Sequence, residues 1–201
     1  MKFSFRSVEG RPIPGKRWVG VWWKRYPNEK YESHHDALIA KLGLFAAADF
    51  ERIGRWKDGA RSDSKWRPNI ASVAYPVWMQ AVKEVPTCPE DAQVLSFLDD
   101  WAERKYTDTY SNGPQEKRFG LSRATTLLYF LSAKRFPIFD SRVRTAIRRL
   151  GAEPIAYEPE AYLEKYLPLM DQIAKACGTR DMRKVDQALF AYGSKKAPFE
   201  Q

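Results

Sequence analysis

Apolar residues recur three and four positions apart along most of the chain, the spacing that gathers side chains on one face of an α-helix. Alternation of apolar and polar residues, which is typical of a half-buried strand, is nearly absent, and no internal repeat is visible. The pattern therefore predicts an all-α fold. We expect helices over 33–48, 70–82 with an interruption at Pro76, 90–106, from Ser122, from Asp140, over 158–178 and over 180–193.

Two of these helices have clear apolar faces that we expect to point into the core. Glycine is common directly after a helix, so Gly178 and Gly193 are expected to end the last two helices. The two apolar faces consist of Val94, Leu95, Leu98 and Trp101, and of Leu121, Ala124, Thr125, Leu128 and Leu131.

The first 32 residues differ from the rest because they are rich in proline, glycine and tryptophan. We expect 1–32 to form an irregular or short-stranded arm that is anchored by Trp18, Trp22 and Trp23. Residues 33–201 are expected to form a single helical domain, with a hairpin at 115–131, a loop and helix at 134–150, and helical lobes that flank a cleft.

Positive charge is concentrated in one part of the chain. The sequence has 34 Lys and Arg against 25 Asp and Glu, a net charge of +9, and residues 115–150 account for +7 of it. A local positive field of this kind is typical of a polyanion site, although a solvated helix face would also look like this. The basic residues of 115–150 are Lys117, Arg118, Arg123, Lys134, Arg135, Arg142, Arg144, Arg148 and Arg149, against the acids Glu116 and Asp140.

Other features exclude several classes of protein. Cys88 and Cys177 lie far apart, which favours a reduced, cytoplasmic protein without a disulfide or metal cluster. His34 and His35 are neighbours that point in different directions on a helix, so we expect no metal site there. No apolar run is long enough for a signal peptide or a membrane span. We expect no cofactor, and a monomer in solution.

A turn and helix start at residues 117–123 suit an anion. Gly120 allows a close approach of the backbone, and a helix that starts near Ser122 presents free N–H groups. With Lys117, Arg118 and Arg123 beside this helix start, a phosphate is the expected guest. A helix start without any guest is the alternative reading.

Asp140 is the one acid between the apolar loop 136–139 and the following basic helix. A carboxylate at a helix start caps the helix and is stabilised by the helix dipole, so structure alone could explain this residue. The alternative is a chemical role inside a basic cleft.

The two segments together, "FGLSRATTLL" and "FPIFDSRV", resemble the helix-hairpin-helix Gly/Pro-Asp DNA glycosylase superfamily. The resemblance covers 115–150. It implies that Gly120, Leu121 and Ser122 form the hairpin that grips DNA, with Ser122 in place of the second glycine of the usual pattern. It also implies that Asp140 is the catalytic acid.

The resemblance implies a monofunctional enzyme. Bifunctional members carry a lysine nucleophile just after the hairpin, and Ala124 stands at the matching position. The expected reaction is hydrolysis of the N-glycosidic bond of a damaged or modified base, in which Asp140 supports a sugar that becomes cationic or activates a water molecule. Arg142 and Arg144 are expected to hold DNA phosphates.

The base must leave the duplex to reach such a site, which requires a pocket that can hold it. Trp56 and Lys57 resemble a Trp-Lys element of less characterised glycosylase-like proteins, whereas a core tryptophan and a solvated lysine are the plain alternative. Residues 185–193 resemble the last helix of oxidised-guanine glycosylases. Asp186 and Phe190 then stand at base-contacting positions, although Asp186 on a helix surface is the alternative.

The sequence thus predicts a DNA glycosylase that acts on double-stranded DNA. Repair and defence against phages with hypermodified pyrimidines both remain open as biological roles. A helix-hairpin-helix protein that only binds DNA is the main alternative, and it would not need Asp140. A helix-turn-helix regulator is disfavoured by the acid at the start of the basic helix, and a magnesium endonuclease by the lack of a carboxylate cluster.

Overall fold

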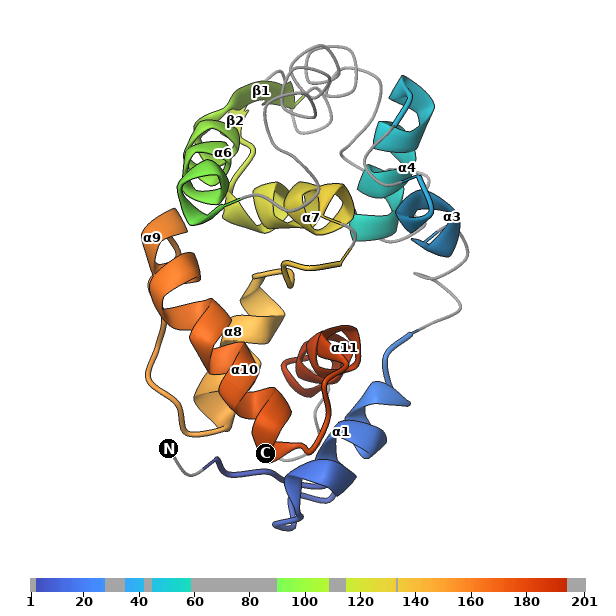
Figure 1. Cartoon of the computed structure of the whole chain (residues 1–201), viewed down its shortest axis with the longest axis vertical. Coiled ribbons are helices and arrows are strands. Elements are labelled where there is room, and N and C mark those ends of the chain that lie inside the picture. The colour runs from blue at the N-terminus through green and yellow to red at the C-terminus, as the bar shows by residue number, and fades with distance from the viewer. Residues whose placement is uncertain are drawn as a thin grey trace. The chain divides into compact units, whose positions relative to one another are not determined.

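The structure, a computed structural model, describes residues 3–27, 35–41, 45–58, 90–108, 115–132 and 134–194 (Figure 1). The described residues are mostly helical, which confirms the all-α class. The chain divides into two compact units, here unit 1 (1–27 and 137–201) and unit 2 (28–136). The single domain that the sequence predicts over 33–201 stays a prediction.

Unit 1 contains α1 (Gly15–Trp23), α8 (Ser141–Arg149), α9 (Pro159–Ala161), the π-helical turn η1 (Tyr162–Tyr166), α10 (Leu167–Ala176) and α11 (Met182–Tyr192). Helix α11 packs against α1, α8 and α10, so it is the centre of this unit. Trp18 and Trp22 of α1 are buried, and both rings meet Tyr192 of α11 edge-on, at 5.4 and 5.0 Å between centroids.

Residues 3–14 of the N-terminal arm are irregular apart from a β-bridge between Arg6 and Pro12, whereas α1 forms in its second half. Gly15 shows why a Pro- and Gly-rich segment becomes a helix here. A β-carbon at this position would collide with the carbonyl oxygen of Ala176 and the ring of Phe5, so the glycine serves the close approach of α1 to the end of α10. Tertiary packing therefore decides the conformation of this segment, against its local propensity.

Unit 2 contains α3 (His35–Ile39), α4 (Ala47–Asp58), α6 (Asp91–Glu103), β1 (Lys105–Asp108), β2 (Gln115–Arg118) and α7 (Leu121–Leu131). Helices α4 and α6 pack against α7. Every residue of the apolar face predicted for α7 is buried. On α6, Val94, Leu98 and Trp101 are buried as expected, whereas Phe97 takes an inward position and Leu95 is only partly covered.

Two local predictions in unit 2 are wrong. The single helix expected over 33–48 is two helices, because Asp49 stabilises a new helix start by accepting a hydrogen bond from the Ala46 N–H group at 2.9 Å. Strands β1 and β2 form an antiparallel pair, which the polar segments 105–108 and 115–118 do not predict. The helix expected over 70–82 lies outside the described residues.

The C-terminal helices follow the predicted pattern with one addition. The expected helix 158–178 is continuous but contains the π-helical turn η1 in its first half. Gly178 adopts a left-handed conformation with φ of 64°, and Gly193 is the C-cap of α11, which confirms both helix ends.

Candidate active site

Asp140 is the N-cap of α8, as the sequence predicts. Its Oδ1 atom accepts hydrogen bonds from the backbone N–H groups of Arg142 and Val143, both at 3.0 Å. The residue is only 8% exposed. A buried carboxylate at the positive end of a helix has a fixed position, which is useful for an acid that must face a reacting atom.

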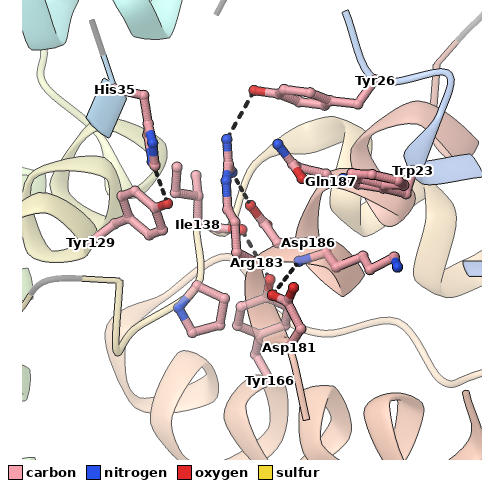
Figure 2. A network of polar contacts seen from close by, with 12 residues as sticks. Trp23, Tyr26, His35, Tyr129, Ile138, Tyr166, Asp181, Arg183, Asp186 and Gln187 are labelled. Atoms are coloured by element: carbon pink, nitrogen blue, oxygen red, sulfur yellow. Dashed lines mark hydrogen bonds and ion pairs between the residues drawn. The ribbon is translucent and has the colours of Figure 1, made fainter. Parts of the chain in front are cut away.

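The backbone before Asp140 is fixed by two tyrosines of η1. The Tyr162 hydroxyl donates to the Pro137 carbonyl at 2.8 Å, and the Tyr166 hydroxyl donates to the Ile138 carbonyl at 2.9 Å. Figure 2 shows the second of these bonds. Both tyrosine side chains are fully buried. Two consecutive carbonyl groups of the loop are thus held by two hydroxyl groups that are four residues apart.

The tyrosines also lie close to two carboxylates. Burial raises the pKa of Tyr166 well above its usual range, and the negative charges of Asp186 and Asp140 raise it further. Burial and Asp186 act in the same direction on the pKa of Tyr162. Both hydroxyl groups therefore stay protonated and keep donating at neutral pH. The Phe139 ring stacks on the Tyr166 ring with 4.4 Å between the centroids, so the loop also packs against η1.

Helices α8 and α11 meet beside Asp140. The Arg142 guanidinium lies over the Phe190 ring at 4.3 Å, a cation–π contact between a predicted DNA-binding residue and a predicted base-pocket residue. A β-carbon on Gly193 would overlap with the carbonyl group of Arg142, so only glycine allows this approach. On the same helix as Arg142, Arg144 lies over the Tyr157 ring at 5.0 Å.

Asp186 is buried and belongs to a polar network that links α11 with the end of the arm (Figure 2). Its Oδ2 atom accepts from Nη1 of Arg183 at 2.8 Å, and Nη2 of Arg183 donates to the Tyr26 hydroxyl at 3.2 Å. The Tyr26 ring in turn meets Phe190 edge-on at 5.4 Å. A base amino group that bound Asp186 would therefore share this carboxylate with Arg183.

The segment that the sequence predicts to be the hairpin lies in unit 2. Gly120 is the N-cap of α7 with φ of 80° and ψ of 156°, a conformation that is essentially restricted to glycine. Its N–H group donates to the Ala102 carbonyl at 3.0 Å, and the Phe119 N–H group donates to the Arg104 carbonyl at 2.7 Å. Because Gly120 has no side chain, no side-chain cap covers the start of α7.

The cations around this turn are engaged in different ways. Nη1 of Arg123 folds back to the Phe119 carbonyl at 3.0 Å, and Arg118 is exposed and forms an ion pair with Glu103 at 2.9 Å. Ser122 is partly exposed in the first turn of α7. Lys117 lies in β2, and its side chain is outside the described part. Their predicted contacts with DNA stay predictions.

Trp56 lies in the core of unit 2 and is 7% exposed. Its ring is parallel to Tyr129, with centroids 6.1 Å apart, and meets Phe130 edge-on at 5.0 Å. In the same cluster, Nε2 of His35 is 2.6 Å from the Tyr129 hydroxyl (Figure 2). Lys57 is partly exposed. This burial matches the plain alternative for Trp56, and its contact with a base stays a prediction.

Comparison with known protein families gives a match that includes residues of both units. Residues 74–190 match the family described as "Putative 8-oxoguanine DNA glycosylase OGG-like protein". This match covers more than half of the chain. The chain belongs to this family. Searches of curated proteins and of solved structures found no match. Family membership supports a DNA glycosylase-type function with DNA as the binding partner.

The part that matches the OGG-like family includes Asp140, the Gly120 turn, η1, Asp186 and Phe190, but not Trp56, Lys57 or α1. Sequence reasoning missed Tyr162, Tyr166 and Arg183. The tyrosines are separated by four residues and could have indicated a shared helix face, but nothing in the sequence identifies the carbonyl groups 25 and 28 residues away as their acceptors.

The described ranges of this OGG-like protein contain no group of three or more His, Cys, Asp or Glu that could hold a metal ion. Among the helices in these ranges, none combines the length and apolar character needed to cross a membrane.

Proposed function

We propose that the protein is a monofunctional DNA glycosylase. It hydrolyses the N-glycosidic bond of a damaged or modified base that is flipped out of double-stranded DNA, and it leaves an abasic site. It acts as a monomer in the cytoplasm and without a cofactor. The observation that carries this proposal is the placement of Asp140, a buried acid whose backbone is held by two tyrosine hydroxyl groups next to a helix rich in arginine.

Asp140 supplies the charge that the reaction needs. As the bond to the base breaks, the deoxyribose becomes cationic, and a fixed carboxylate stabilises this cation or activates the attacking water molecule. The hydrogen bonds to Oδ1 and the tyrosine contacts keep this carboxylate in place, so little reorganisation is needed during the reaction. Removal of one such preorganised group typically costs about 100- to 1000-fold in rate.

Water is the final nucleophile in this proposal. Ala124 stands at the position of the lysine of bifunctional relatives, and it is fully buried within α7. No amine is present there to form a covalent intermediate with the sugar. The abasic product should therefore remain uncleaved until alkali is added.

The flipped base is held by residues of unit 1. Phe190 offers a ring that Arg142 already contacts, and Asp186 offers a carboxylate to an exocyclic amino group. A contact of Trp56 and Lys57 in unit 2 with the base stays a prediction. The family description names 8-oxoguanine, and the large aromatic content of the chain also suits a bulky modified pyrimidine of phage DNA.

The phosphate backbone is gripped at two places. In unit 2 the start of α7, with Gly120, Ser122 and Arg123, takes a phosphate at its first turn, which no side chain caps, and Lys117 and Arg118 add positive charge. In unit 1 Arg142 and Arg144 of α8 contact phosphates near Asp140. Binding through several phosphates should weaken steeply between about 50 and 200 mM salt.

The test is an excision assay on a panel of duplexes that carry 8-oxoguanine, other oxidised bases or hypermodified pyrimidines, with normal DNA as reference. We expect strand breaks only after alkali treatment, and loss of them in Asp140→Asn. The matched control is Asp181→Asn, because Asp181 is the N-cap of α11 and accepts from the Lys184 N–H group at 3.0 Å. The proposal fails if no duplex is cut, or if both variants cut as well as the natural protein.

A further inference from the structure

A second basic surface lies on the N-terminal arm, outside the segment that matches the family. Residues 3–27 contain six Lys or Arg against a single acid, Glu9, a net charge of +5. Together with the +7 of residues 115–150, this exceeds the net charge of the whole chain, so the remaining residues are net negative. The arm is therefore a separate centre of positive charge. Its cations are Arg6, Arg11, Lys16, Arg17, Lys24 and Arg25.

Helix α1 separates its apolar and basic residues cleanly. Its buried side consists of Gly15, Trp18, Val19 and Trp22, which pack toward α11 and the end of α10. The opposite side, here the basic arm face, consists of Lys16, Arg17, Gly20 and Lys24. The three cations on it are exposed.

Packing does not explain the basic arm face. In the described part of the chain, Lys16, Arg17 and Lys24 have no acidic partner, whereas an exposed cation of unit 2 such as Arg118, at 2.9 Å from Glu103, does. Lys16 and Arg17 lie in the first turn of α1, where the helix dipole disfavours positive charge. The arrangement therefore costs stability unless an anion binds.

Gly20 gives an independent indication. It lies in the interior of α1, where glycine is unfavourable, and a β-carbon there would meet no atom within 4 Å. The fold does not require a glycine at this position. A residue without a side chain between Arg17 and Lys24 allows a partner to approach the helix backbone closely.

We propose that the basic arm face binds the phosphate backbone of duplex DNA beyond the nucleotide at the active site. Arg17 and Lys24 are seven residues apart, about 10 Å along a helix, which corresponds to about three nucleotide steps of about 3.4 Å. A membrane surface fits less well, because interfacial helices insert an apolar face and the apolar face of α1 is buried against α11. This inference rests on the proposed function, since it assumes that DNA is the partner.

The test removes the three cations together, in the variant Lys16→Gln, Arg17→Gln, Lys24→Gln of the full chain. Binding to an unmodified 30-base-pair duplex is followed by fluorescence anisotropy between 50 and 200 mM salt. Each phosphate contact adds about 0.9 to the slope of log K against log salt. For three contacts we expect the slope of the variant to be shallower by about 2.7, so its affinity should fall about 40-fold less than that of the natural protein across this range. The variant should also bind more weakly than the natural protein at 50 mM salt.

A matched control removes three exposed cations from another part of unit 1, in Lys165→Gln, Lys175→Gln, Arg180→Gln. This control should keep the slope of the natural protein. Equal slopes for the natural protein and the arm variant, with both folded by circular dichroism, would overturn the proposal. Loss of binding to phosphatidylserine vesicles with unchanged DNA binding would overturn it as well.

The same variant distinguishes this inference from the proposed function. Under single-turnover conditions with saturating protein, the arm variant should excise at the natural rate, because the basic arm face does not touch the reacting nucleotide. Asp140→Asn should show the reverse, with natural DNA affinity and lost excision. If no duplex is cut by the natural protein, the proposed function fails, and the difference in salt slope still decides the role of the arm.

Discussion

Helices α7 and α8 both follow a loop of the candidate site, but they begin in opposite ways. Helix α8 begins at Asp140, whose carboxylate accepts from the Arg142 and Val143 N–H groups. Helix α7 begins at Gly120, which offers no side chain to the N–H groups of the first turn. One helix start is capped by its own carboxylate, and the other has no side-chain cap.

The difference indicates a division of labour between the two units. In unit 1 the acid is buried and its loop is fixed by Tyr162 and Tyr166, which suits a group that must be in place before the reaction. In unit 2 the uncapped start of α7 suits a guest that carries its own negative charge, such as a phosphate. Variants that disturb one helix start at a time therefore test this difference.

The largest effect on stability is expected from Gly193→Ala. The new methyl group would overlap with the Arg142 carbonyl in the first turn of α8, so α11 must move away from the helix that carries Asp140. We expect a loss of about 3 kcal/mol in the free energy of unfolding, measured with urea. Gly20→Ala is the control, because its methyl group meets no atom and should stabilise α1 by up to about 1 kcal/mol. An equal effect of both variants would contradict the close contact.

The next effect is expected from Gly120→Ala, which strains the uncapped helix start of α7. The backbone conformation with φ of 80° should cost about 2 kcal/mol with any side chain. Gly151→Ala is the matched control, since Gly151 has the same φ of 80° after α8 and no neighbouring atom near the added carbon. Both variants should lose stability, but only Gly120→Ala should weaken DNA binding in an anisotropy assay. Equal DNA affinities of the two variants would show that Gly120 does not contribute to phosphate binding.

Tyr166→Phe tests the capped helix start. It removes the donor of the Ile138 carbonyl and should cost about 1 to 2 kcal/mol, because a buried acceptor loses its partner. If the tyrosine positions Asp140, the single-turnover rate should also fall about tenfold, with unchanged affinity for DNA. Tyr157→Phe, at an exposed tyrosine, should change neither quantity. A rate that stays natural in Tyr166→Phe would leave the tyrosine with a purely structural role.

The smallest expected effect is the pH dependence of the free energy of unfolding that arises from the hydroxyl groups of Tyr162 and Tyr166. Their pKa values in the folded protein are raised above the usual value of 10.0, so their contribution to stability is complete below about pH 10 and is lost as the pH rises further. Burial also raises the pKa of the Cys177 thiol from 9.0 to about 12, which adds a loss in the same direction from about pH 9. Urea unfolding between pH 8 and 11 should show this decline, and it should be shallower in Tyr166→Phe. A pH-independent unfolding energy would contradict the burial of these groups.

The two helix starts could be predicted because they depend on neighbouring residues. Features that depend on contacts between residues distant in sequence could not be predicted. Asp140 as N-cap and the buried face of α7 follow from residues within one or two helical turns. Helix α1 was missed because Gly15 becomes helical through its contact with the end of α10, which is distant in sequence. The β1–β2 pair was missed because its four-residue strands are polar. The assignment of Asp186 to a base pocket did not anticipate its ion pair with Arg183.

The central claim is that the negative charge of Asp140 acts on the reacting sugar, beyond its role as a helix cap. Asp140→Asn separates these roles, because asparagine caps a helix about as well as aspartate but carries no charge. On a duplex that the natural protein cuts, single-turnover excision should fall at least about 100-fold, while the free energy of unfolding stays within about 0.5 kcal/mol. An excision rate within about threefold of the natural rate, equivalent to less than about 0.7 kcal/mol, would contradict the account.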